Sequence, residues 1–362
     1  LYKLIPNTDN SASIVSLIAN DFTITDTYSY EYQNNYNNGA AHGKGSGPFL
    51  SAVTLPNKQV ILVPFSSSNV GIYDPINDVY TNGPTQSGGS AAFIGGVLAR
   101  NGKVIMIPVG AGFMGIYEPI QNYFRVGASV GSTAGPYHGG VLDSSGDVIC
   151  VPYNASTIGI YDPIADTFTN GPAHGEVTPA FVGGVLAPNG KVILVPRNSA
   201  NVGIYDSSSN TYTSGAAHGE GANAFTGGVV APNGLIIFSP TNSANVGIYD
   251  PSTDTYTSGA PHLTGVTSAF FGAVLAANGK VILVPGNSSN VGIYDPITNT
   301  YTSGPAHSVG SSAFHTGILS SNGSIVFCPL NSSVIGRFGI NITPLLNDSF
   351  QRNIILPLFN KL

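Results

Sequence analysis

The tripeptide Gly-Ile-Tyr recurs along this chain at a nearly constant interval. Six copies end at Tyr73, Tyr117, Tyr161, Tyr205, Tyr249 and Tyr294, and a degraded seventh copy, Gly336-Arg337-Phe338, is in phase with them. Successive copies are 44 residues apart, except for one interval of 45. A period of this length indicates that one supersecondary unit is repeated, and that each copy buries its apolar face against its neighbours. The sequence therefore predicts a repeat architecture.

Within one copy, residues 178–221, four segments have the composition of β-strands. An Asn-Gly dipeptide, typical of a tight hairpin, joins the first two segments. The second segment is an apolar run that stops at Pro196, which is typical of a strand buried on both faces. Asp-Pro, typical of a type I turn, joins the last two segments in most copies. The predicted strands are residues 180–187, 191–195, 202–206 and 211–215. Four antiparallel strands without helical periodicity predict a propeller blade.

The number of strands predicts the number of blades. First strands occur near Phe49, Phe93, Tyr137, Phe181, Phe225, Phe270 and Phe314. Six fourth strands follow in order, whereas the seventh, at residues 36–43, precedes the first copy. We therefore predict an all-β fold, a seven-bladed β-propeller of four-stranded antiparallel blades. The N-terminal strand completes the C-terminal blade, which closes the ring and removes exposed sheet edges.

The same pattern predicts the domain boundaries. The blades are expected at about 46–89, 90–132, 133–177, 178–221, 222–265 and 266–310, with residues 311–342 and 21–45 together forming the last blade. Residues 21–342 then form a single propeller. Residues 1–20 are an N-terminal extension and residues 343–362 a C-terminal tail. These terminal segments are expected to extend the last blade, to cover a face, or to mediate assembly with a partner.

Composition excludes several classes of partner. Charged residues make up 8% of the chain, the net charge is -6, and no basic cluster occurs, which argues against a nucleic-acid groove. The apolar runs are too short to span a bilayer. Cys150 and Cys328 occupy equivalent strands one residue out of register, so we expect two separate buried thiols and no disulfide between them.

One hairpin of the repeat resembles a known family. The segment Ile293-Tyr-Asp-Pro-Ile-Thr-Asn-Thr-Tyr301 is similar to the hairpin between the third and fourth strands of kelch-type propellers. The chain departs from that pattern because Trp is absent and because the double glycine lies in the first strand, as at Gly95-Gly96 and Gly183-Gly184. The resemblance implies the propeller fold alone, since this fold carries many functions. The strand glycines are explained by close approach of backbones near the axis.

A histidine series lies on the face formed by the loops between second and third strands and between fourth and first strands. His42, His174, His218, His262 and His307 each follow the fourth-strand aromatic by six residues, and Gln86 and Val130 occupy the other two places. Two hypotheses stay open: packing between strands, as the Gly-His pair of WD-repeat propellers implies, or a collar of contacts to a ligand or partner. One histidine per blade is too widely spaced for bonds to one ion, so no metal and no cofactor is predicted.

A few residues on or near this face break the repeat. His138 and His315 stand at a first-strand position near the axis that other copies fill with Ile94, Val182, Thr226 or Phe271. Glu176, Glu220 and Arg197 are candidate contact residues in the loops. The repeated carboxylates, such as Asp206 and Asp250, are explained by turn formation on the opposite face. No set of acid, base and nucleophile is evident, so no catalytic residue is predicted.

These observations lead to one expected function and two alternatives. The candidate loops are short and nearly identical, so we expect a non-enzymatic display, attachment or structural protein that binds a protein partner or a surface glycan by avidity. Its expected location is extracellular, or the surface of a cell or virus particle. The first alternative is a carbohydrate-binding propeller that uses amides, hydroxyls and tyrosines. The second is an enzyme at the mouth of the channel that uses His138, His315 or Glu176.

Overall fold

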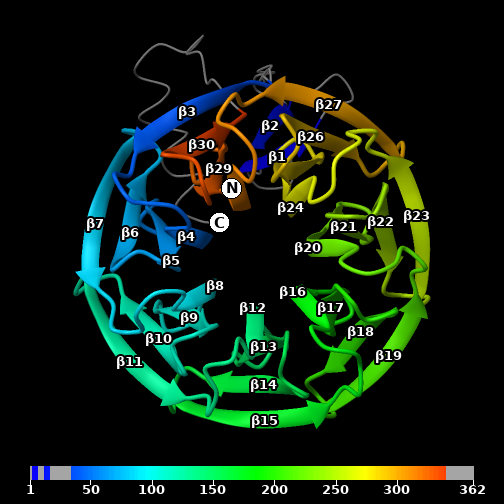
Figure 1. The fold of residues 1–362 in the computed structure, drawn as a ribbon. Coiled ribbons are helices and arrows are strands. Elements are labelled where there is room, and N and C mark those ends of the chain that lie inside the picture. The colour runs from blue at the N-terminus through cyan, green and yellow to red at the C-terminus, as the bar shows by residue number, and fades with distance from the viewer. Residues whose placement is uncertain (1, 7–11, 17–33, 340–362) are drawn as a thin grey trace.

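Seven four-stranded antiparallel sheets surround a central channel in the computed structural model, which describes residues 2–6, 12–16 and 34–339 (Figure 1). The described residues contain no helix. We number the blades 1 to 7 by the order of their first strands, which lie nearest the channel (Figure 1). The predicted all-β, seven-bladed fold is confirmed.

From the channel outwards, blades 1 to 6 use their strands in chain order, whereas the outermost strand of blade 7 comes from the N-terminal part of the chain. The first strands are β4 (Phe49–Thr54), β8 (Phe93–Leu98), β12 (Tyr137–Leu142), β16 (Phe181–Leu186), β20 (Phe225–Val230), β24 (Phe270–Leu275) and β28 (Phe314–Leu319). The second strands are β5 (Val60–Pro64), β9 (Val104–Pro108), β13 (Val148–Pro152), β17 (Val192–Pro196), β21 (Ile236–Pro240), β25 (Val281–Pro285) and β29 (Ile325–Pro329). The third strands are β6 (Asn69–Asp74), β10 (Phe113–Glu118), β14 (Thr157–Asp162), β18 (Asn201–Asp206), β22 (Asn245–Asp250), β26 (Asn290–Asp295) and β30 (Val334–Phe338). The fourth strands are β7 (Val79–Thr85), β11 (Tyr123–Ser129), β15 (Thr167–Ala173), β19 (Thr211–Ala217), β23 (Thr255–Pro261), β27 (Thr300–Ala306) and β3 (Tyr36–Ala41).

The ring closes through blade 7, whose strands come from both ends of the chain. Strand β3 pairs antiparallel with β30, with Tyr36 opposite Phe338 and Asn38 opposite Gly336. The predicted closure is therefore confirmed. A separate hairpin, β1 (Tyr2–Pro6) with β2 (Ala12–Ser16), lies within the predicted N-terminal extension. The predicted tail, residues 343–362, lies outside the described residues.

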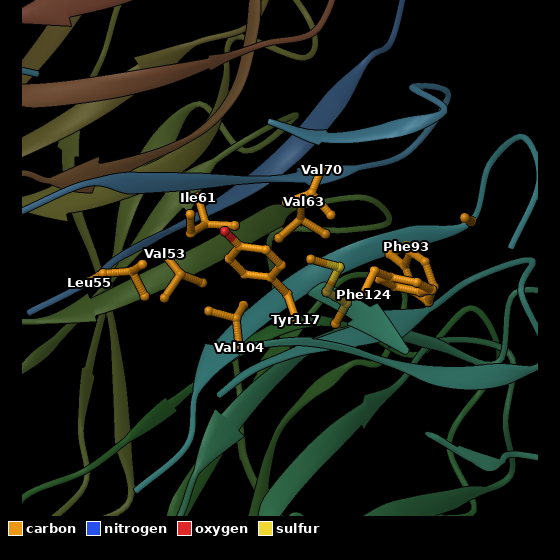
Figure 2. Packing of buried hydrophobic residues seen from close by; sticks show 11 residues of the cluster. Val53, Leu55, Ile61, Val63, Val70, Phe93, Val104, Tyr117 and Phe124 are labelled. Atoms are coloured by element: carbon orange, nitrogen blue, oxygen red, sulfur yellow. The ribbon is translucent and has the colours of Figure 1, made fainter. Parts of the chain in front are cut away.

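The core lies between neighbouring blades. In each blade the second strand is buried along its whole length, so both of its faces belong to this core. The Gly-Ile-Tyr tyrosines are among the largest fully buried side chains. Tyr117 of blade 2 belongs to a cluster of buried hydrophobic residues that includes Ile61, Val63 and Val70 of blade 1 (Figure 2). The repeated tyrosine thus packs against the preceding blade, which explains why each copy needs a neighbour.

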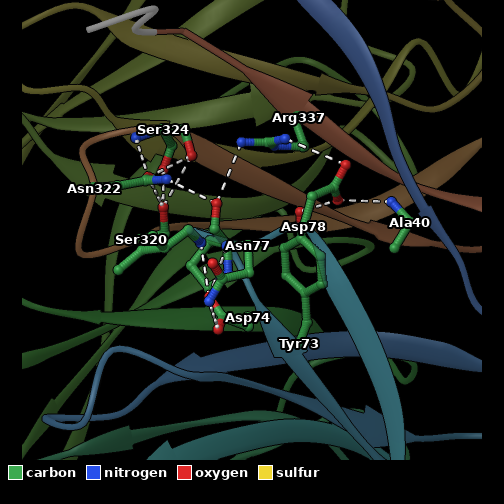
Figure 3. A network of polar contacts seen from close by, with 11 residues as sticks. Ala40, Tyr73, Asp74, Asn77, Asp78, Ser320, Asn322, Ser324 and Arg337 are labelled. Carbon is green, nitrogen blue, oxygen red and sulfur yellow. Dashed lines mark hydrogen bonds and ion pairs between the residues drawn. The ribbon is translucent and has the colours of Figure 1, made fainter. Parts of the chain in front are cut away.

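A polar contact on the outer side of the ring links successive blades. Asp78 accepts hydrogen bonds from the Tyr73 hydroxyl of its own blade and from the Ala40 backbone N–H of blade 7, both at 2.8 Å (Figure 3). Its other carboxylate oxygen lies 3.4 Å from the Arg337 guanidinium. Asp166, Asp254 and Asn299 accept the equivalent two bonds in blades 3, 5 and 6. These contacts align neighbouring blades and help to fix the closing pair.

The first-strand glycines allow the backbones to approach each other around the channel. A Cβ atom on Gly139 would lie 3.2 Å from the Gly183 Cα, and one on Gly183 would lie 3.1 Å from the Gly227 Cα. All three residues also have positive φ angles. The predicted close approach of backbones is confirmed, since a side chain at these positions would meet both steric and backbone strain.

The two cysteines lie in different parts of the core. Cys150 belongs to a cluster between blades 2 and 3, whereas Cys328 belongs to one between blades 7 and 1. Both thiols are free and buried, as the sequence predicts.

Candidate functional site

Two rings of side chains meet at the mouth of the channel, and both vary from blade to blade. The first ring is the second residue of each first strand: Leu50, Ile94, His138, Val182, Thr226, Phe271 and His315. The second ring is the residue that follows the proline ending each second strand: Phe65, Val109, Tyr153, Arg197, Thr241, Gly286 and Leu330. In blades 4, 5 and 6 the third and fourth strands are nearly copied, so these three blades differ chiefly near the channel.

These two rings enclose a cavity of about 570 Å³. Its wall consists of Phe65, Ile94, Val109, His138, Tyr153, Arg197, Asn223, Thr226, Thr241, Asn242, Ser268, Phe271, His315 and Leu330. Ligand pockets in proteins commonly have volumes between about 300 and 1,000 Å³. The cavity is therefore large enough for a small organic molecule.

Four aromatic rings form a continuous series along the cavity wall. His138 of blade 3 lies 5.8 Å from His315 of blade 7, measured between ring centroids. Tyr153 lies 5.5 Å from His138, and Phe271 lies 5.6 Å from His315. Blades 3 and 7 are not neighbours, so the two imidazoles meet across the channel. Of the ten candidate residues, these two and Arg197 are the ones that line the cavity.

Both imidazoles are uncharged at neutral pH. The pKa of His315 is lowered to about 4, chiefly by burial; a hydrogen bond to the Leu50 carbonyl opposes this shift, and the charge of Arg197 contributes to it. Burial also lowers the pKa of His138, with smaller contributions in the same direction from His315 and Arg197. His315 donates from Nδ1 to the Leu50 oxygen at 2.9 Å, so its Nε2 carries a lone pair.

Arg197 is the charged residue of the cavity wall. Its guanidinium carbon lies 5.5 Å from the centroid of the Tyr153 ring, in the range of a cation–π contact. Its Nε is buried and has no hydrogen-bond partner among the described residues. No Asp or Glu belongs to the described cavity wall, so the positive charge is not balanced there.

The five-histidine series lies within the loops and away from the cavity wall. His218 donates from Nε2 to the Ser199 carbonyl at 2.8 Å, and its Nδ1 accepts the Glu220 backbone N–H at 3.1 Å. The equivalent bonds occur at His42, His174, His262 and His307. All five side chains are buried, with exposed fractions of 3 to 7%. Each imidazole therefore connects two loops of one blade and has little surface left for a ligand.

Gln86, which replaces histidine in blade 1, makes the same pair of contacts. Its Nε2 donates to the Ser67 carbonyl at 3.0 Å, and its Oε1 accepts the Gly88 backbone N–H. An amide and an imidazole can both combine one donor with one acceptor at this spacing. Six of the seven blades thus have a bridging pair of hydrogen bonds at this position, and blade 2, with Val130, is the exception.

The two candidate glutamates join neighbouring blades. Glu176, in the loop after blade 3, accepts hydrogen bonds from Ser199, Tyr212 and Ser214 of blade 4. Glu220 makes the corresponding contacts with Ser243 and Tyr256 of blade 5. The structure therefore does not bring Glu176 to the histidine pair.

In residues 2–6, 12–16 and 34–339, no group of three or more His, Cys, Asp or Glu side chains could hold a metal ion. The same residues include no helix with the length and hydrophobicity that crossing a membrane would require.

Sequence reasoning missed part of the cavity wall, above all Phe65, Tyr153 and Thr241. The signal that could have found them is the variation of the residue after each second-strand proline, because the flanking residues are nearly constant. Variation at one fixed position of a repeat indicates that the position does not serve the fold alone.

The chain is a seven-bladed β-propeller with one asymmetric cavity at the channel mouth. No protein-family model and no curated protein sequence matches it. The kelch resemblance therefore stays a prediction.

Solved structures similar to this chain include propellers of very different sequence. One is a catalytically inactive virginiamycin B lyase from Staphylococcus aureus with quinupristin, which is 12% identical with a TM-score of 0.72 over 86% of this chain and 100% of the other. A streptogramin B lyase is 11% identical, with the same TM-score, over 86% of this chain and 99% of the other. Hydrazine synthase from Kuenenia stuttgartiensis is 11% identical, with a TM-score of 0.68, over 84% of this chain and 100% of the other. At these identities the likeness shows the fold alone.

Proposed function

We propose that the protein binds a small molecule in the cavity at the mouth of its channel. The observation that carries this proposal is the concentration of sequence divergence in the two rings that line the cavity. Blades 4 and 5 both contain Asn-Val-Gly-Ile-Tyr-Asp in their third strands, yet their ring positions hold Val182 and Arg197 in one and Thr226 and Thr241 in the other. A purely structural channel would have no need for this asymmetry.

The hydrogen bonding of the repeated loops supports the cavity over the loops as the binding site. In blade 4, the Ser199 hydroxyl donates to the Asn201 carbonyl, and the Asn201 side-chain amide donates to the Gly215 carbonyl. The Asn198 side-chain oxygen accepts the Asn223 backbone N–H. These polar groups are occupied within the protein, which leaves them less able to bind a glycan or a protein partner. Attachment through repeated loops and carbohydrate binding stay predictions.

A screen of chemically diverse small molecules by thermal shift tests the proposal. Val109→Trp would fill the cavity from its rim, and Ile120→Trp is the matched control because Ile120 is 95% exposed in an outer turn. We expect compounds that raise the melting temperature of the wild type and of the control but not that of Val109→Trp. Binding that is equally strong in both variants, or no binding by any compound, would contradict the proposal.

A second candidate function is enzymatic and rests on the histidine pair. A neutral imidazole whose Nδ1 is held by a backbone carbonyl can act as a base through Nε2, and His315 has this arrangement. Compounds found in the screen can be incubated with the wild type and with His315→Phe, and the products analysed by mass spectrometry. Turnover that is lost in the variant while binding persists would support an enzyme, whereas unchanged compounds would favour binding alone.

A further inference from the structure

The wall of the cavity is chemically divided between two sides of the ring. Blades 7, 1 and 2 contribute four apolar residues, Leu330, Phe65, Ile94 and Val109, and one polar residue, His315. Blades 3, 4 and 5 contribute Tyr153, Arg197, Thr226, Thr241 and Asn242, which all carry polar groups. A ligand that fits both sides must itself have one apolar and one polar end.

The polar side has a net positive charge at neutral pH. Arg197 supplies the charge, and the two neutral imidazoles, His138 and His315, neither add to it nor balance it. A charged group removed from water is costly unless an opposite charge or hydrogen bonds compensate it. The buried Arg197 Nε has no such partner within the described residues. A negatively charged group supplied by a ligand would balance the charge of the guanidinium.

The chemistry of the guanidinium restricts what this group is. Its N–H groups form a planar fork that matches the two oxygens of a carboxylate or another oxyanion. The Tyr153 ring beneath Arg197 restricts its orientation from one side. Phe65, Ile94 and Val109, from the other side of the ring, offer an apolar surface to the rest of the ligand.

From this division we infer that the ligand is an organic anion, with one oxyanion group held by Arg197 and an apolar body against Phe65, Ile94 and Val109. The inference rests on the proposed function, since it names the class of molecule that the cavity takes. A charged group without an apolar body would leave Phe65, Ile94 and Val109 without a contact. An uncharged apolar molecule would leave Arg197 unpaired.

Two probes of the same shape test the inference. Binding of 1-naphthoate and of 1-naphthamide, which lacks the charge, is measured by isothermal titration calorimetry with the wild-type chain. Because hydrogen bonds to charged groups are stronger than neutral ones, we expect naphthoate to bind roughly ten- to hundredfold more tightly. Acetate, which has the charge but no apolar body, is expected to bind more weakly than naphthoate.

Arg197→Gln should remove the preference for the anion. Naphthoate affinity is expected to fall roughly tenfold or more, while naphthamide affinity stays unchanged. Arg100→Gln is the matched control, because Arg100 is an exposed arginine that bonds the Ser144 and Ser145 carbonyls in the turn of blade 3. A structural role for Arg197 would lower the melting temperature of the unliganded variant. We expect no decrease, since the substitution removes an unpaired buried group.

The outcomes separate this inference from the proposed function. Equal affinity for the two probes, or unchanged naphthoate binding in Arg197→Gln, overturns the inference and leaves the cavity as a binding site. Failure of both probes, when other compounds from the screen do bind, likewise overturns it. If nothing binds, the proposed function fails together with the inference.

Discussion

His138 and His315 meet across the channel, with the centroids of their imidazoles 5.8 Å apart. Their blades, 3 and 7, are separated by two blades in one direction around the propeller and by three in the other. Both rings are partly buried, and Arg197 lies close enough to lower the pKa of each. Protonation of either imidazole would place a second positive charge in the same cavity. The pair is therefore the part of the described structure from which a pH effect follows most directly.

Stability should fall as the pH decreases from 6.5 towards 4. Unfolded histidine binds a proton near pH 6.5, whereas folded His315 does so only near its pKa of about 4, so the unfolded state binds more protons in this window. Replacement of His315 by Phe, the residue at the equivalent position 271 of blade 6, removes this contribution. Between pH 6.5 and 4.5, urea unfolding should show a stability loss about 1–2 kcal/mol smaller in His315→Phe than in the wild type.

Carboxylates also titrate at the acidic end of this range, but they are common to both proteins and cancel in the comparison. Parallel dependence of unfolding free energy on pH for the wild type and His315→Phe would contradict the lowered pKa.

His218 should be replaceable by glutamine but not by alanine. Glutamine can restore the two bonds to Ser199 and Glu220, as Gln86 does in blade 1. We expect His218→Gln to change the free energy of unfolding by less than about 1 kcal/mol, and His218→Ala to lower it by about 2–4 kcal/mol, because alanine leaves two buried backbone groups unpaired. Chemical denaturation measures both. Equal destabilisation by the two variants would show that the bridging hydrogen bonds do not explain why histidine occupies position 218.

Asp254 should contribute more to stability than its counterpart Asn210. Asp254 accepts bonds from the Tyr249 hydroxyl and from the Ala216 backbone of the preceding blade, whereas Asn210 accepts one from Tyr205. The residue of blade 3 that is equivalent to Ala216 is Pro172. Proline has no backbone N–H, so blade 3 cannot donate this bond to Asn210. Both residues have a φ of 52°, so replacement by glycine relieves the same backbone strain at each position.

We therefore expect Asp254→Gly to destabilise the protein by about 1 kcal/mol more than Asn210→Gly. Thermal or chemical unfolding of the two variants provides the comparison. If the two changes cost the same, the contact between blades does not contribute to stability.

The two buried thiols should report on opening of the ring. Burial raises the pKa of Cys328 to about 12 and also raises that of Cys150, so neither forms a reactive thiolate in the folded protein at pH 8. Cys328 lies in blade 7, where β3 and β30 are joined by no turn, and this pairing is the natural place for local opening.

Thiol-reagent kinetics on Cys150→Ala and Cys328→Ala, each with one remaining thiol, should show Cys328 reacting roughly tenfold faster than Cys150. Equal rates would indicate that both thiols become accessible only by global unfolding.

Much of the fold could be predicted because its determinants are local. The Asn-Gly turn at residues 189–190 and the apolar run before Pro196 specify one hairpin, and the 44-residue period repeats it around the ring. The site was predicted less completely. His138, His315 and Arg197 were identified as candidate residues, but Tyr153 was not, because an aromatic residue beside a strand is usually explained by packing.

The number of blades, their strands and the closing pair of β3 with β30 follow from the amino-acid pattern, because apolar runs and turn residues act over a few neighbouring positions. The side chains that meet at the axis, by contrast, are known only from the folded ring. His138 reaches His315 because ring closure brings non-adjacent blades to one channel, and His218 is withdrawn from the surface because two loops fold onto it. Contacts across a closed ring depend on the positions of all seven blades at once, and no local pattern encodes them.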